Sequence, residues 1–112
     1  MTVTAKPLFE PLQAQNAETT QYTAPTGTRT IIDKVTGTNT TGAVATLTIK
    51  LVASGGAASA SNTIVSAKTL QPGEAYTFPE VVGHVLNPGD FISTLAGTAA
   101  AITIRASGRE VS

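Results

Sequence analysis

The chain has 112 residues, with seven basic and seven acidic side chains, one histidine and no cysteine. This length predicts one domain with one core, and the missing cysteines exclude disulfides, thiolate chemistry and sulfur-ligated metals. Only 12% of the residues are charged and no charge run occurs, so we expect no nucleic-acid partner and a surface made largely for neighbouring proteins.

Residues 1–18, MTVTAKPLFEPLQAQNAE, predict an extended N-terminal arm ahead of the body. They show neither the basic start of a signal peptide nor an apolar run long enough for a membrane span. Pro7 and Pro11 remove backbone donors and hold their predecessors extended. We therefore expect the arm to dock outside its own subunit. The predicted interface consists of three large apolar residues, Leu8, Phe9 and Leu12.

Residues 19–112 predict an antiparallel all-β domain with little or no helix. Threonine, with 20 copies, favours strands, and the 17 alanines follow no helical period. The clearest strand is residues 45–51, where Ala45, Leu47, Ile49 and Leu51 alternate with Thr46, Thr48 and Lys50.

The stretch TRTIIDKVTGTNT also alternates, and it places Asp33 on the same predicted face as Ile31 and Val35. A carboxylate on an inward face needs a partner, which Arg105 or Lys34 can supply.

Two Pro-Gly pairs punctuate the second half of the chain, in QPG (71–73) and NPG (87–89). Proline presets φ at the second turn position and glycine supplies a positive φ at the third, which predicts type II turns. The predicted turn formers are Pro72, Gly73, Pro88 and Gly89. The strands that follow the two turns predict an antiparallel β-sandwich, jelly-roll-like, with seven to nine short strands in all.

His84 is the one side chain that can act as a base near neutral pH without perturbation. Its candidate helpers are Glu74, Glu80, Asp90 and Ser93. A catalytic triad needs a nucleophile, a base and an orienting group that converge, and the GHV context matches no such signature. We interpret His84 as a surface residue and Asp90 as a turn residue that bonds nearby backbone N–H groups. We predict no enzyme activity, no cofactor and no metal site.

Three stretches together resemble small β-sandwich virion proteins of tailed bacteriophages. They are YTAPTGTRTIIDKVTGTNTTGAVATLTIKLV, LQPGEAYTFPEVVGHVLNPGDFIS and AITIRASGREV. The phrase L-x-P-G-E followed by L-x-P-G-D-x-I carries much of the likeness, which covers about residues 20–111 and leaves the arm out. Members of that group decorate capsids as cement proteins or form parts of head fibres and tails. No catalytic residue carries over.

The resemblance implies a capsid decoration or cement protein on the virion exterior, assembled in the host cytoplasm. Its expected partners are the major capsid protein or another virion protein and further copies of itself, with a trimer as one option. The alternative is a head-fibre or tail-fibre module that contacts another virion protein or a host glycan. Glycan binders usually present exposed aromatics, and Tyr22 and Tyr76 both lie in strand patterns, which favours the capsid reading. No membrane partner is expected.

Overall fold

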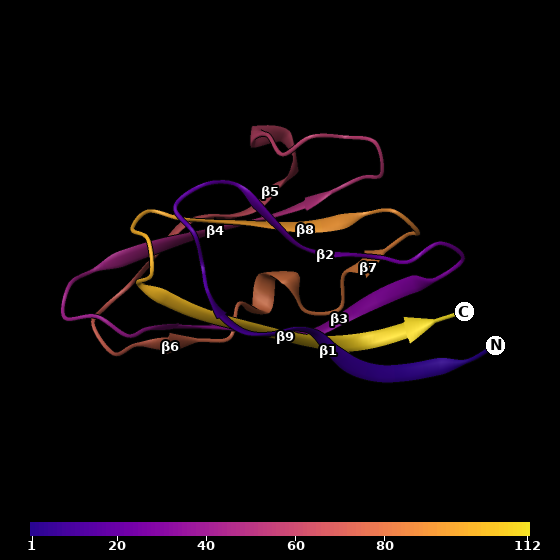
Figure 1. The fold of residues 1–112 in the computed structure, drawn as a ribbon, viewed down its shortest axis with the longest axis horizontal. Coiled ribbons are helices and arrows are strands. Elements are labelled where there is room, and N and C mark those ends of the chain that lie inside the picture. Colours follow the sequence, from indigo (N-terminus) through magenta and orange to yellow (C-terminus); the bar gives the residue numbers. More distant parts are fainter.

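The structure, a computed structural model, describes residues 1–112 as an all-β, antiparallel molecule with nine strands and two short 3-10 helices. Two sheets lie one above the other, and the N- and C-termini meet at one end of the long axis (Figure 1). Thr2 and Ser112 exchange backbone hydrogen bonds of 2.9 Å in both directions. None of its helices has the length and hydrophobicity that crossing a bilayer requires.

The first sheet has the strand order β1-β9-β3-β6, with β7 also paired to β3. Its strands are β1 (Val3–Gln13), β9 (Ile102–Val111), β3 (Arg29–Asn39), β6 (Ala75–Tyr76) and β7 (Val85–Leu86). The second sheet has the order β2-β8-β4-β5. Its strands are β2 (Thr19–Thr23), β8 (Phe91–Ala96), β4 (Ala45–Val52) and β5 (Thr63–Leu70).

Strand β4 has the alternation that its sequence predicts. Ala45, Leu47 and Ile49 are buried in the core, and Leu51 packs against that core while partly exposed. The prediction for this strand is therefore confirmed, because alternate side chains of a strand project to opposite faces.

The core between the sheets takes side chains from both of them. The first sheet contributes Ile32, Val35, Ile102, Ile104 and Ala106 among others, and the second contributes Leu47, Ile49, Val65, Leu70 and Ile92 among others. The 3-10 helix η2 (Pro79–Val81) lies between the sheets (Figure 1) and contacts β3 and β5. Phe78 and Val81 are fully buried there, so this segment closes one open side of the core.

The prediction of a separate N-terminal arm is wrong, because the structure places residues 3–13 in the first sheet as strand β1. Strand β1 pairs antiparallel with β9 from Val3 opposite Val111 to Gln13 opposite Thr103. Prolines are tolerated because β1 is an edge strand and its pairing is interrupted near Pro7 and Pro11 by two register shifts. The boundary predicted at residue 18 therefore divides one folded unit.

The predicted interface residues lie against the core of their own chain. Leu8 and Phe9 are each 7% exposed and belong to the core cluster, and Leu12 packs against it. A register shift between Pro7 and Phe9 interrupts the strict alternation of β1, which is how two consecutive apolar residues are both buried. The prediction that these three side chains dock outside the subunit is wrong in this fold.

Asp33 also departs from its prediction. A register shift between Ile32 and Lys34 in the pairing of β3 with β9 changes which residues face inward, so that Ile32 and Val35 are buried. Asp33 is exposed, and its carboxylate accepts two hydrogen bonds from Arg109 Nε, at 3.1 and 3.2 Å. The partner is therefore Arg109, and neither Arg105 nor Lys34 is needed.

Both Pro-Gly turns form as predicted. Gly73 and Gly89 have φ values of 76° and 88°. In each turn the backbone N–H after the glycine donates to the carbonyl three residues earlier, at 2.9 Å from Glu74 to Gln71 and from Asp90 to Asn87. The acidic side chain after the glycine then accepts the N–H of the first turn residue, at 2.7 Å for Glu74 and 2.9 Å for Asp90. The two turns are thus built alike.

Candidate functional site

The side chain of His84 forms no hydrogen bond with any of its candidate helpers. His84 is exposed between η2 and β7. Its backbone carbonyl accepts a hydrogen bond of 3.0 Å from Ile32 N of the first sheet. The four candidate helpers are engaged elsewhere. Glu74 accepts from Gln71 N, Glu80 from Tyr76 OH, and Asp90 from Ser54 N and Asn87 N, while Ser93 donates to Glu18. No group of three or more potential metal-ligating side chains occurs in the chain.

A polar cluster around Tyr22 joins the two sheets. Tyr22 OH, from β2, donates to Glu110 Oε2 of β9 at 2.5 Å and lies 2.7 Å from Thr30 Oγ1 of β3. Lys6 Nζ of β1 lies 3.5 Å from the same carboxylate oxygen. Burial and the hydrogen bond to Glu110 raise the pKa of Tyr22 to about 12. With every group partnered, this cluster is a structural link between the sheets.

A second cluster anchors the connection between β1 and β2. Glu18 pairs with Lys50 of β4 and accepts a hydrogen bond of 2.7 Å from Ser93 Oγ of β8. Burial opposes the charged form of Glu18, but the hydrogen bonds from Lys50 and Ser93 and the Lys50 charge outweigh it. The pKa of Glu18 therefore lies below its usual value. Ser93 is 2% exposed, and its hydroxyl donates to a carboxylate, so it is held by structure rather than poised as a nucleophile.

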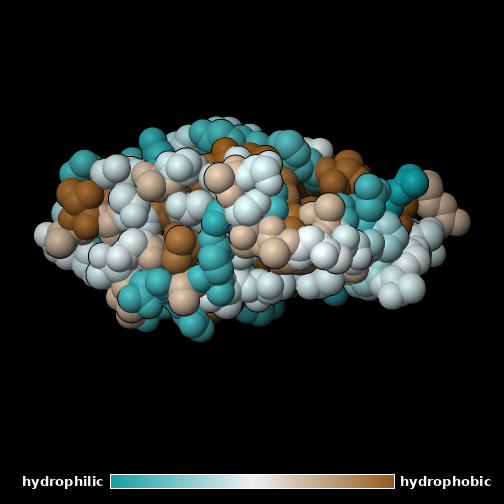
Figure 2. Space-filling model, turned by 90° about the horizontal axis from the view of Figure 1, so that it is seen from above, coloured by the Kyte–Doolittle hydropathy of each residue, from teal (hydrophilic) through white to brown (hydrophobic).

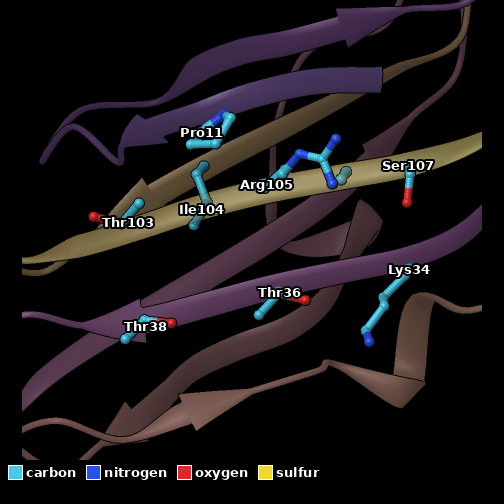
Figure 3. A pocket seen from close by; sticks show the side chains of 9 residues that line it. Pro11, Lys34, Thr36, Thr38, Thr103, Ile104, Arg105 and Ser107 are labelled. Atoms are coloured by element: carbon cyan, nitrogen blue, oxygen red, sulfur yellow. The ribbon is translucent and has the colours of Figure 1, made fainter. Parts of the chain in front are cut away.

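The remaining feature is a shallow groove of about 340 Å³ on the first sheet, which Figure 3 shows from close by. Strands β9 and β3 form its floor, and Pro11 of β1 lies along one side (Figure 3). The lining residues are Pro11, Lys34, Thr36, Thr38, Thr103, Ile104, Arg105, Ala106 and Ser107.

Strand register sets the pattern of polar groups in the groove. Three cross-strand pairs lie in sequence along β3 and β9, namely Lys34 with Ser107, Thr36 with Arg105 and Thr38 with Thr103. The buried neighbours Val35, Ile104 and Ala106 face the core, so these polar side chains face away from it. The face thus presents two cations and four hydroxyls in a fixed array.

Sequence reasoning did not single out this groove. In the last strand Thr103 and Arg105 alternate with Ile102 and Ile104, but this alternation does not show that β9 pairs with β3. The signal available in the sequence was the run of outward polar residues in each strand. Only the register brings the two runs side by side.

Large apolar side chains are exposed at scattered positions. They are Met1, Val3, Val44, Ile64, Val82 and Val85. Seen from the second-sheet side, apolar atoms form separate patches among polar ones (Figure 2). Scattered apolar residues of this kind are usual on protein surfaces, so the groove is the feature with the most defined chemistry.

Comparison of the chain with protein-family models, with curated proteins and with solved structures finds no match.

Proposed function

We propose that the chain is a β-sandwich of the jelly-roll type. The strand order of the two sheets supports this assignment. It is β1-β9-β3 followed by β6 and β7 in the first sheet, and β2-β8-β4-β5 in the second. In a jelly roll, eight antiparallel strands wrap as two Greek keys into two four-stranded sheets. Here β6 and β7 both pair with β3 and together take the place of one interrupted strand.

We infer that the protein is a non-enzymatic structural protein of a tailed-phage particle, bound to the outer surface of the capsid. The observation that carries this proposal is the strand order, since the jelly roll is a recurrent architecture of viral capsid domains. The link from fold to role is an analogy. The resemblance of the two Pro-Gly phrases to phage decoration proteins supports the same conclusion, and both phrases form equivalent turns.

The proposed partners are the major capsid protein and further copies of this chain, with a trimer as the expected oligomer. The molecule measures 46 × 26 × 19 Å, and its two hydrogen-bonded Pro-Gly turns and the polar links between its sheets suit a rigid decoration. Assembly would take place in the host cytoplasm.

The test is to follow the chain through phage assembly. Particles from infected cells are separated on a density gradient and probed with an antibody raised against the purified protein. We expect the chain to sediment with filled heads, and a reconstruction of the particle to place it on the capsid exterior. A chain found only in the particle-free fraction would contradict the proposal.

The alternative is a head-fibre or tail-fibre module that contacts a host glycan or another virion protein. The groove on the first sheet favours it, because jelly rolls also serve as lectin domains. Labelling of tails or fibres instead of heads in the same experiment would select this alternative.

A further inference from the structure

The groove on the first sheet holds cations that the protein itself does not neutralise. Lys34 forms no ion pair, and Arg105 lies 3.9 Å from Glu10 Oε1 with both side chains at least half exposed. Such an exposed, long ion pair has little energetic value. In contrast, Lys6, Lys50 and Arg109 each have a carboxylate partner within 3.5 Å. The groove thus keeps two positive charges available to a ligand.

The hydroxyls of the groove are also available. The side chains of Thr36, Thr38, Thr103 and Ser107 make no hydrogen bond within the protein, whereas Thr30, Thr48 and Ser93 on other faces do. Each hydroxyl is both a donor and an acceptor. The free hydroxyls therefore match a ligand that is itself rich in hydroxyl groups.

Two features narrow the class of ligand. No aromatic side chain lines the groove, so neither the stacking of bases nor a platform for neutral sugars is provided. The net charge of the chain is zero, which is unlike the basic footprint that nucleic-acid binders present. A ligand held here must gain its affinity from anionic groups and hydroxyls.

We propose that this groove binds an acidic oligosaccharide, with a carboxylate of the sugar on Arg105. A guanidinium binds a carboxylate through two parallel hydrogen bonds. Lys34 lies across the floor from Arg105, on the β3 side (Figure 3). It meets a second anionic group as a point charge, and the hydroxyls of Thr36 and Ser107 bond to the sugar between the two cations. The proposal does not depend on a place for the protein in a virion.

The two cations stand at diagonal positions of adjacent strands, which suits an extended ligand better than a small one. Lys34 is diagonal to Arg105 across the pair of strands, since Arg105 lies opposite Thr36. The backbone positions of diagonal neighbours in an antiparallel sheet are about 7–8 Å apart, and the Lys34 side chain extends from β3 away from Arg105 (Figure 3). A ligand that engages both cations must therefore extend over more than one residue pair, as a chain of acidic sugars does, while a single small anion engages one of them.

The experiment uses nuclear magnetic resonance on the full chain, with hexagalacturonate as the carboxylated probe and maltohexaose as its neutral counterpart. We expect hexagalacturonate to shift the amide signals of β3 and β9 around Thr36 and Arg105, and maltohexaose to shift none. The double variant Lys34→Gln with Arg105→Gln should weaken binding by at least about tenfold. Thr36→Val should weaken it less, because it removes one neutral hydrogen bond.

The matched control is Arg29→Gln, which removes an equally unpaired cation from the same strand but outside the groove. We expect this variant to bind hexagalacturonate as the native chain does, and all variants to keep the native unfolding temperature. Absence of shifts with hexagalacturonate would overturn the proposal. Equal weakening of binding by Arg29→Gln would also overturn it, because it would show non-specific electrostatic attraction. Equal binding of maltohexaose would overturn it as well, because that ligand is neutral. Tighter binding of single-stranded oligothymidylate than of hexagalacturonate would assign the groove to nucleic acid instead.

Discussion

At the scale of single residues, close approaches and buried polar links decide what each position tolerates. Asn39 is fully buried, and its side chain donates to the carbonyls of Ala43 and Leu70 while accepting from Thr41. No buried side-chain polar atom in the structure lacks a partner. The polar atoms of such residues are therefore used in hydrogen bonds that stabilise the fold.

Gly108 is the position where an added methyl group should cost most. A Cβ atom there would lie 2.3 Å from the backbone carbonyl oxygen of Ile31 on the adjacent strand. Gly108→Ala must therefore separate β9 from β3, and we expect it to lower the free energy of unfolding by about 3 kcal/mol or more. Chemical denaturation measures the change.

The control for this substitution is Gly42→Ala, at a glycine that has no neighbouring atom within 4 Å and no positive φ. We expect it to leave stability unchanged or to raise it slightly, by about 0.5 kcal/mol. A Gly108→Ala variant as stable as the Gly42→Ala variant would show that the two strands are farther apart than the structure has them.

Tyr22→Phe tests the link between the sheets. It removes the hydroxyl that bonds Glu110 and Thr30, and we expect a loss of about 1.5–3 kcal/mol at neutral pH. The folded pKa of about 12 lies above the usual value of 10.0. The protonated Tyr22 hydroxyl therefore makes its full contribution to the free energy of unfolding below pH 10, and this contribution is lost as the pH rises through 12.

The stability difference between native protein and Tyr22→Phe should consequently shrink between pH 10 and pH 12. Denaturation curves for both proteins across this range measure it, and the comparison cancels the titration of other groups. A difference that stays constant to pH 12 would mean that the hydroxyl is not held by Glu110.

At the scale of elements, the edge strand β1 and the connection after it hold the two sheets together. Ala14 N donates to Ile102 O in the first sheet at 2.8 Å, and Ala96 N in the second sheet donates to Gln15 O at 2.9 Å. The chain thus crosses between the sheets while bonded to both. Strand β1 is part of the folded domain, so we expect its removal to lower the stability of the whole domain.

Phe9→Ala should lower the free energy of unfolding by about 3–5 kcal/mol, because it leaves a cavity beneath β1. Deletion of residues 1–13 should unfold the protein, as judged by circular dichroism and by the dispersion of amide signals. The control is Val3→Ala, at an apolar position of the same strand that is 53% exposed. A truncated chain that stays folded would restore the picture of a separate arm.

Glu18→Gln tests the anchor of the β1–β2 connection. The pKa of Glu18 lies below its usual value of 4.5, so its carboxylate contributes stability above that pH and loses it as the pH falls through the folded pKa. We expect the variant to be about 1 kcal/mol less stable than the native protein at pH 7. The two should converge at low pH, in thermal unfolding measured across the acid range.

At the scale of the whole molecule, the two sheets share one core and two polar links, so they cannot come apart independently. We expect a single cooperative unfolding transition, with fluorescence of Tyr22 and Tyr76 coinciding with the β signal in circular dichroism. Two separated transitions would show that the sheets unfold as distinct units.

Much of this fold follows from the sequence because the causes are local. Proline and glycine fix the backbone at 71–73 and 87–89 whatever surrounds them, and the alternation in β4 depends only on the pleat of a strand. The turn role of Asp90 is local too, since its carboxylate bonds Asn87 N three residues earlier. These predictions needed no knowledge of which strands are neighbours.

Tertiary structure alone decided the rest, because it depends on pairing between distant segments. The N-terminal residues join the sheet because Leu8 and Phe9 are buried beside β9, at the other end of the chain. Proline lacks a backbone N–H, but an edge strand tolerates this because one of its sides has no partner strand. Asp33 turns outward because the register with β9 shifts next to it. The groove exists because the same register sets Arg105 opposite Thr36, and hydrophobic alternation within one strand carries no information about its partner.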